Sequence, residues 1–212
     1  MRFSLLRRRR STAAVARERL QVLLAHERPL LARPDLLVTL REDILGVIAE
    51  LREKFDWVIC DSPAGIERGA TLAMRHADAA VIVVNPEVSS VRDSDRIIGL
   101  LDAKTVKAER GESVDKVLLV TRYDPARAAR GEMLNIEDVL EILSVPLLGI
   151  IPESEDVLRA SNLGSPTLLS SDATVPGRAY LDAAKRLNGE KVPITIPSVK
   201  KGIFRLFARR AA

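Results

Sequence analysis

The sequence predicts an α/β fold built on a parallel sheet of about four strands. Short apolar runs rich in β-branched residues recur along the chain, and a polar turn follows each of them. Segments with helical periodicity separate these runs, as expected for parallel strands joined by crossover helices. Strands are expected at residues 56–60, 80–84, 117–121 and 147–151, and helices near 68–77, 91–109, 135–143, 154–161 and 176–188.

Composition indicates a cytoplasmic globular protein. With 212 residues and 47% hydrophobic content, the chain can bury one core and a small appendage. The single cysteine, Cys60, excludes an internal disulfide and is typical of a buried apolar residue in a reducing compartment. No apolar run reaches the length of a spanning helix, and residues 3–6 are too short for a signal-peptide core.

The charge is distributed unevenly. The net charge is +4, but residues 1–33 and 199–212 are strongly basic while the segment between them is acidic. Uniform basicity would indicate nucleic acid. Basic ends that carry large apolar side chains instead indicate an anionic membrane surface. We therefore expect a membrane partner and no nucleic acid.

The N-terminal region combines an anchor-like segment with an extension that is helical or switchable. Phe3, Leu5 and Leu6 precede four arginines, which suits a weak, reversible membrane anchor of about 1 kcal/mol per basic residue. A solvated basic tail and an organellar transit peptide are the alternatives. The periodicity of residues 13–27 fits both a helix and a strand. A second helix is expected from residue 34 to about 53.

Asp61 follows the apolar run at residues 56–60. An aspartate at the carboxyl end of a parallel strand lies where open α/β sheets bind ligands. In P-loop NTPases such an aspartate holds Mg²⁺, and a following switch loop senses the phosphates. Ser62, Pro63 and Gly65 supply such a loop here, although a polar turn without chemistry is the alternative.

Three long motifs follow the predicted strands: FDWVICDSPAGIE at 55–67, NPEVSSVRDSDR at 85–96 and TRYDP at 121–125. Through them, residues from about 50 to 212 resemble the C-terminal part of MinD, the membrane-associated ATPase of septum placement. Residues 1 to about 48 resemble the N-terminal half of MinE, which stimulates that ATPase. This second resemblance is carried by RERLQ at 17–21, Pro34-Asp35 and LREDIL at 40–45. The chain thus resembles a hybrid of the Min system.

The resemblance implies three parts: a MinE-like membrane- and MinD-binding segment at 1–48, a truncated MinD-like domain of P-loop type at 49–198, and an amphipathic membrane-targeting helix at 199–212. It also implies three residue sets and no catalytic or metal-ligating residue. The residual nucleotide and magnesium site comprises Asp61, Ser62, Pro63, Gly65, Thr121, Arg122, Pro152 and Glu153. The partner-binding set comprises Ala16, Arg19, Leu20, Leu23, Ser89, Ser90, Asp93 and Asp95. The membrane set comprises Phe3, Leu5, Leu6, Ile203, Phe204, Leu206 and Phe207.

Two of these sets have a simpler interpretation. The region of Ser89 to Asp95 also fits a surface helix with solvated charges, capped by Ser89 or Ser90. Residues 121–125, 152 and 153 would also look the same as turns without a ligand.

For residues 200–210, two phenylalanines on one arc of a short helix fit an interfacial anchor better than a core segment.

A phosphate-binding loop is absent from these 212 residues. It requires a glycine-rich turn followed by a lysine, yet none of the eleven glycines begins such a pattern and no Gly-Lys pair occurs. We therefore expect no cofactor, with Mg-ATP bound only if the parent activity is retained. The first strand of the family's sheet is also missing. An apolar strand edge should be exposed unless the MinE-like segment or another chain covers it.

The expected function is septum-site selection in bacterial cell division, as a binding or regulatory protein at the inner face of the cell membrane. MinD, MinC or both are the expected partners, with MinE as a further one. An active MinD-type ATPase is the first alternative. A recombination or gene-model product without a selected function is the second.

Overall fold

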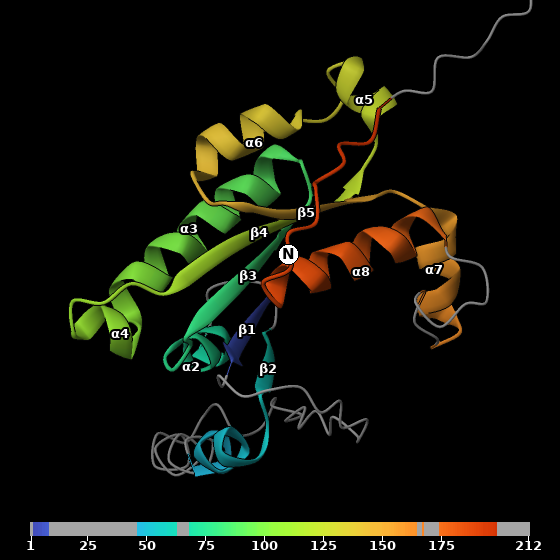
Figure 1. Ribbon diagram of the computed structural model, residues 1–212. Coiled ribbons are helices and arrows are strands. Elements are labelled where there is room, and N and C mark those ends of the chain that lie inside the picture. The colour runs from blue at the N-terminus through green and yellow to red at the C-terminus, as the bar shows by residue number, and fades with distance from the viewer. Residues whose placement is uncertain (1, 9–45, 63–67, 165–166, 168–173, 199–212) are drawn as a thin grey trace, which may run out of the picture.

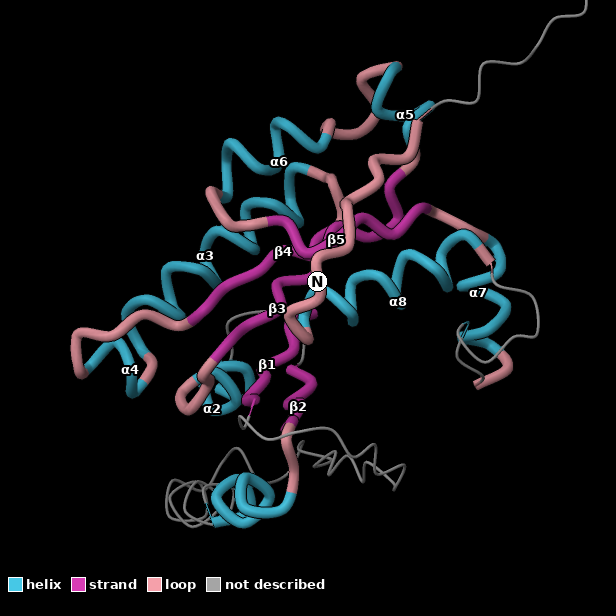
Figure 2. The backbone as a smooth tube through the Cα atoms, viewed as in Figure 1, coloured by secondary structure: helices cyan, strands magenta, loops and turns pink. Residues whose placement is uncertain are grey.

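The computed structural model describes residues 2–8, 46–62, 68–164, 167 and 174–198 (Figure 1). Strands and helices alternate along most of this length, as Figure 2 shows. The strands are β1 Arg2–Arg8, β2 Trp57–Ser62, β3 Ala79–Val84, β4 Asp115–Tyr123 and β5 Leu147–Pro152. The helices are α2 Arg68–Met74, α3 Val88–Lys104, α4 Val106–Glu109, α5 Pro125–Ala129, α6 Ile136–Leu143, α7 Glu155–Asn162 and α8 Val175–Leu187.

The five strands form one sheet in the order β2-β1-β3-β4-β5. β3, β4 and β5 are parallel neighbours, and all four strands expected from the sequence are present. β1 pairs antiparallel with both β2 and β3. β2 and β3 are therefore parallel to each other but separated by β1. The α/β fold class is confirmed, and β1 makes the described sheet mixed.

β1 lies where an exposed strand edge was expected (Figure 1). Its Phe3 faces Ser62 of β2, and its Leu5 faces Cys60 of β2 and Ala80 of β3. Because it runs antiparallel, β1 starts at the carboxyl ends of its neighbours and finishes at their amino ends. The N-terminal segment thus covers the edges of both strands with its backbone.

Helices cover the two faces of the sheet unequally. α2, α3 and α6 pack on one face, against alternate residues of the strands such as Ile82 and Val120. The intervening residues, including Val81, face α8 in a smaller cluster. Ile82 and Val81 of β3 belong to different clusters because successive side chains point to opposite faces of the sheet. The larger core lies on the α2–α3–α6 face. Its buried members include Met74, Ile82, Ile97, Leu101, Leu118, Val120, Ile136 and Val139.

The helix expected at 91–109 is two helices. α3 already begins at Val88, after Glu87, and it ends before Thr105. Thr105 has an extended backbone, and its hydroxyl accepts the Ala108 N–H at the start of α4 and donates to the Leu101 carbonyl. Thr105 is fully buried. Its hydroxyl therefore satisfies backbone groups on both sides of the break.

Arg186 of α8 fixes the chain that follows this helix. Its guanidinium donates to the carbonyls of Leu148, Val192 and Pro193, each at 2.7 Å. α8 approaches β5 closely here, since a Cβ on Gly149 would lie 3.2 Å from Arg186 Nη1. One side chain thus connects the edge strand to residues 192–193.

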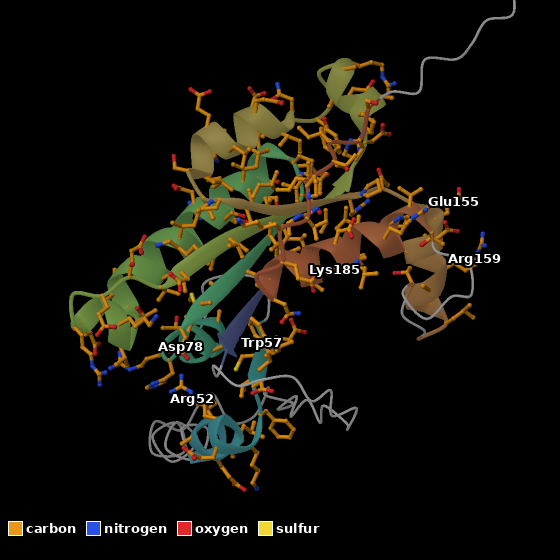
Figure 3. The ribbon with its side chains drawn as sticks, in the orientation of Figure 1. Arg52, Trp57, Asp78, Glu155, Arg159 and Lys185 are labelled. Atoms are coloured by element: carbon orange, nitrogen blue, oxygen red, sulfur yellow. The ribbon has the colours of Figure 1, made fainter. Side chains whose placement is uncertain are left out.

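Residues 46–54 are helical and form the described part of the expected second helix. Arg52 donates to the His76 carbonyl at 2.8 Å and to Asp78 Oδ2 at 3.1 Å (Figure 3). This pair connects the helix before β2 to the turn before β3. No helix among the described residues is long and apolar enough to cross a bilayer.

Candidate functional site

The carboxyl ends of β2, β3, β4 and β5 lie along one edge of the sheet. They are parallel to one another, so the residues that follow them share this edge. Open α/β sheets bind ligands at this edge. Among the described residues, the structure brings together there six residues expected from the sequence: Asp61, Ser62, Thr121, Arg122, Pro152 and Glu153.

Asn85 connects the ends of β3 and β4. The Thr121 hydroxyl donates to Asn85 Oδ1 at 3.0 Å, and the Asn85 N–H donates to Ser90 Oγ at 3.1 Å. Ser94, in turn, donates to the Ser90 carbonyl at 2.8 Å. The loop after β3 is thereby fixed to both β4 and the first turns of α3. Thr121 and Ser90 hold this loop through their side chains.

Arg122 has an unusual backbone for a residue in a strand. Its φ is +57°, in the left-handed region that non-glycine residues rarely adopt, beside a register irregularity of β4. Its Nη2 lies 3.2 Å from Glu153 Oε1, and the Glu153 N–H donates to the Tyr123 carbonyl at 3.0 Å. Both ionised side chains are partly exposed, so the ion pair contributes little to stability. Such strained residues cluster at functional sites.

Asp124 holds the loop that follows β4. Its carboxylate accepts the N–H groups of Ala126 at 2.8 Å and Arg127 at 3.2 Å, and Pro125 occupies the first position of α5. Aspartate at the N-cap followed by proline is a strong helix start. The sequence TRYDP is therefore also a capping motif.

We expect Asp124→Ala to lower the free energy of unfolding by about 1 kcal/mol, because two backbone donors lose their acceptor. Chemical denaturation monitored by circular dichroism measures this change. Asp93→Ala is the matched control, since Asp93 makes only an exposed contact of 3.7 Å with Arg96. An equal loss in both variants would contradict the capping role.

Asp61 and Ser62 end β2 with different exposure. Asp61 is exposed, whereas Ser62 is only 1% exposed. Phe3 of β1 is the register partner of Ser62, so the first residues of the chain lie beside this end of β2. Pro63 and Gly65 lie outside the described residues. Within the described residues, no group of three or more His, Cys, Asp or Glu side chains could hold a metal ion.

Two titratable groups near the sheet have raised pKa values, which makes them poor nucleophiles. Burial raises the pKa of the Cys60 thiol, which Arg52 partly opposes. Burial, with Glu137 and Asp124 nearby, also raises the pKa of the Tyr123 phenol. Both groups therefore stay protonated at neutral pH. The expectation of a structural, unreactive Cys60 agrees with its half-buried position on β2.

The partner-binding residues of α3 form an exposed surface. Ser89, Asp93 and Asp95 are exposed, and Val88, the first residue of α3, is 62% exposed. Ser90 is engaged by Asn85, and Glu87 occupies the N-cap without a side-chain bond, so neither serine caps α3. Val88 is not among the residues expected from the sequence. The predicted helix began at residue 91, and only the structure shows that α3 begins at Val88 and leaves it exposed. Ala16, Arg19, Leu20 and Leu23 lie outside the described residues.

The membrane set is divided. Phe3, Leu5 and Leu6 lie in β1, whose backbone pairs with two strands. Ile203, Phe204, Leu206 and Phe207 lie outside the described residues. The structure places residues 2–8 in the sheet, and their contact with lipid stays a prediction.

A family model described as cellulose biosynthesis protein BcsQ matches residues 28–134, which is half of the chain. The chain belongs to this family. A second model, described as septum formation topological specificity factor MinE, matches residues 1–53. The two matches overlap at residues 28–53.

Curated proteins similar to this chain include MinD proteins. The septum site-determining protein MinD of Neisseria meningitidis is 51% identical over 172 residues, and that of Escherichia coli K12 is 52% identical over 171. Each match covers 79% of this chain and 63% of the relative, so the chain spans less than two thirds of their length. The MinD-like identity of the C-terminal part is thus confirmed.

Solved MinD structures share the fold. MinD of Aquifex aeolicus has a TM-score of 0.64 at 37% identity, covering 73% of this chain and 63% of that one. The MinC:MinD complex from the same organism has a TM-score of 0.65 at 37% identity, covering 74% and 62%. MinD of Pyrococcus furiosus has a TM-score of 0.57 at 26% identity, covering 68% and 56%. The MinD-like α/β domain is therefore established by fold as well as sequence.

Proposed function

We propose that this chain acts in septum-site selection as a membrane-associated, MinD-like binding protein without a nucleotide site of its own. The proposal rests on one observation: a single chain contains both a match to MinE and a MinD-like domain. Such a chain presents to its partners the surfaces of two interacting proteins. It operates at the inner face of the cell membrane, with MinC and MinD as protein partners and MinE as a further one.

The direction of β1 supports the lack of a nucleotide site. A P-loop follows the carboxyl end of its strand and opens a helix whose backbone N–H groups surround phosphate. β1 runs antiparallel, so the residues after Arg8 leave from the opposite edge of the sheet from Asp61. The described residues at the Asp61 edge offer carboxylates, hydroxyls and the Arg122 guanidinium, which is paired with Glu153, but no glycine-rich cradle. They fit Mg-ATP poorly, because most of the phosphate charge would be unmatched.

Calorimetric titration with Mg-ATP, with an intact MinD as the positive control, tests this part of the proposal. We expect no binding heat at concentrations that saturate the control. Anionic vesicles should not induce hydrolysis by this chain. Micromolar binding with turnover would overturn the proposal in favour of an active MinD-type ATPase.

The α3 surface is the proposed docking site for a protein partner. Asp95, seven residues after exposed Val88, lies on the same face of α3. Apolar contact at the centre and charge around it is the usual anatomy of an interface. The solved MinC:MinD complex makes MinC the first partner to test.

We expect Asp95→Lys to weaken capture of MinC at least about tenfold, because reversing a charge opposes complementary electrostatics. Surface plasmon resonance with immobilised MinC measures the affinity. Glu141→Lys makes the same charge change on exposed α6 and is the matched control. Equal affinities of the two variants would exclude α3 as the docking surface.

The proposed membrane anchor lies at residues 199–212. Before this segment, α8 ends at Leu187, Arg186 donates to the carbonyls of Val192 and Pro193, and the chain continues to exposed Ser198. A chain ending at residue 198 should lose cosedimentation with anionic vesicles, because one short helix and its basic residues supply the attraction. Retained cosedimentation would assign the anchor to another part of the chain.

A further inference from the structure

The connection from β2 through α2 to β3 leaves room in the sheet for one more strand between β2 and β3. β2, α2 and β3 form a strand–helix–strand unit whose two strands are parallel but are not neighbours. By contrast, β3 and β4, and then β4 and β5, are parallel neighbours. The unit formed by β2, α2 and β3 therefore encloses a gap one strand wide. We call this gap the central slot, and β1 fills it (Figure 1).

Backbone pairing on both sides holds β1 in the central slot. Residues 3–8 pair with β2, and residues 2–6 pair with β3. No short connection joins β1 to either neighbour, because residues 9–56 separate it from β2. An antiparallel pair can be joined by a two-residue hairpin. The place of β1 is thus fixed by strand pairing and not by a tight turn.

An empty central slot would leave unpaired backbone groups on two strands. Among the described strands, β2 has no neighbour other than β1, and β3 would keep only β4. Two rows of free N–H and C=O groups would then face each other across the gap. Unpaired strand edges bind extended peptide segments through the main chain, with alternate side chains providing specificity. The slot therefore has the features of a strand-binding site.

We propose that the central slot is a strand-exchange site that accepts residues 2–8 from a second copy of this chain. The same backbone ladder forms whichever copy supplies the strand. Exchange of an identical element between copies adds no new kind of contact and is a low-cost route to dimers. The length of chain between β1 and β2 permits the strand to reach a neighbouring molecule. This inference rests on the sheet alone and is independent of the proposed function.

The native Cys60 offers a direct test. Leu5 of β1 is its register partner on β2, and directly opposed residues of antiparallel strands lie within disulfide reach. A full-length variant carrying Leu5→Cys and Cys60→Ser is mixed with a differently sized, tagged wild-type chain under mild oxidation. A disulfide between the two chains then reports β1 of one copy beside β2 of the other, provided that random contact of the thiols is excluded.

Two controls make this test specific. The first control carries Leu6→Cys with Cys60→Ser. Position 6 is the register partner of Ile59, so its thiol lies on the face of the sheet opposite to Cys60. A partner chain carrying Phe3→Cys and Ser62→Cys locks its own β1 in the slot, since Phe3 and Ser62 are also register partners. The locked chain keeps Cys60 available but should refuse an incoming strand.

We expect the Leu5→Cys variant to give at least about tenfold more mixed dimer than the Leu6→Cys variant, because disulfide geometry is restrictive. Locking the partner before mixing should abolish this product. Equal yields from both positions, or a yield unchanged by locking, would overturn the proposal as random thiol contact. A further variant carries Leu5→Cys and keeps the native Cys60. If its disulfide forms only within single chains, the register is confirmed but exchange between copies is overturned.

Discussion

Leu5→Pro should unfold much of the MinD-like domain. Leu5 lies in the middle of β1, and each inner residue of a central strand pairs with one neighbour or the other. Proline removes the N–H and does not fit the centre of a sheet. We expect a loss of about 3 kcal/mol or more in the free energy of unfolding. This is a large part of the stability of a domain of this size.

Urea denaturation of the full-length chain, monitored by circular dichroism, measures the effect of Leu5→Pro. Leu5→Val is the matched control, because it keeps the backbone N–H and has a high preference for strands. It should change the unfolding free energy far less than proline does. If Leu5→Pro and Leu5→Val unfold at the same urea concentration, residues 2–8 do not form a central strand.

Arg186→Met should release the chain that follows α8. The guanidinium makes three bonds of 2.7 Å to carbonyls, and one of them belongs to β5. Bonds from a charged donor each contribute about 1.5–3 kcal/mol, and they are not additive. We expect a net loss of about 2–4 kcal/mol, because methionine fills the space but leaves these carbonyls without a donor.

Limited trypsin digestion distinguishes local release from global unfolding. Cleavage after exposed Lys191 should become faster in Arg186→Met, since Val192 and Pro193 are no longer held. Lys185→Met is the neighbouring control, because Lys185 makes only a contact of 4.0 Å with Asp182. Unchanged cleavage in Arg186→Met would show that other contacts hold this segment.

Local signals were sufficient to predict most elements. The four parallel strands follow from short apolar runs and the polar turns after them, and the predicted boundaries lie within two residues of β2 to β5. The place of Asp61 at the carboxyl end of a strand followed from the same reasoning, whereas Thr121 and Glu153 came from the resemblance to MinD. A strand pattern and a turn are local in sequence.

Other features depended on contacts between distant residues. Thr105 divides a periodic segment into α3 and α4 through bonds of its buried hydroxyl, which no hydrophobic pattern encodes. Val88 became an interface candidate only when its exposure was known. The positive φ of Arg122 was likewise outside what a strand pattern can predict.

The sequence by itself determined the α/β class, the order of the parallel strands along the chain and the two Min resemblances, because these depend on periodicity and motifs. The tertiary structure alone decided the role of residues 2–8. Their combination of apolar and basic residues suits a membrane surface as well as a strand. Pairing with β2 and β3 selects the strand, because residues far away along the chain provide the hydrogen-bonding partners.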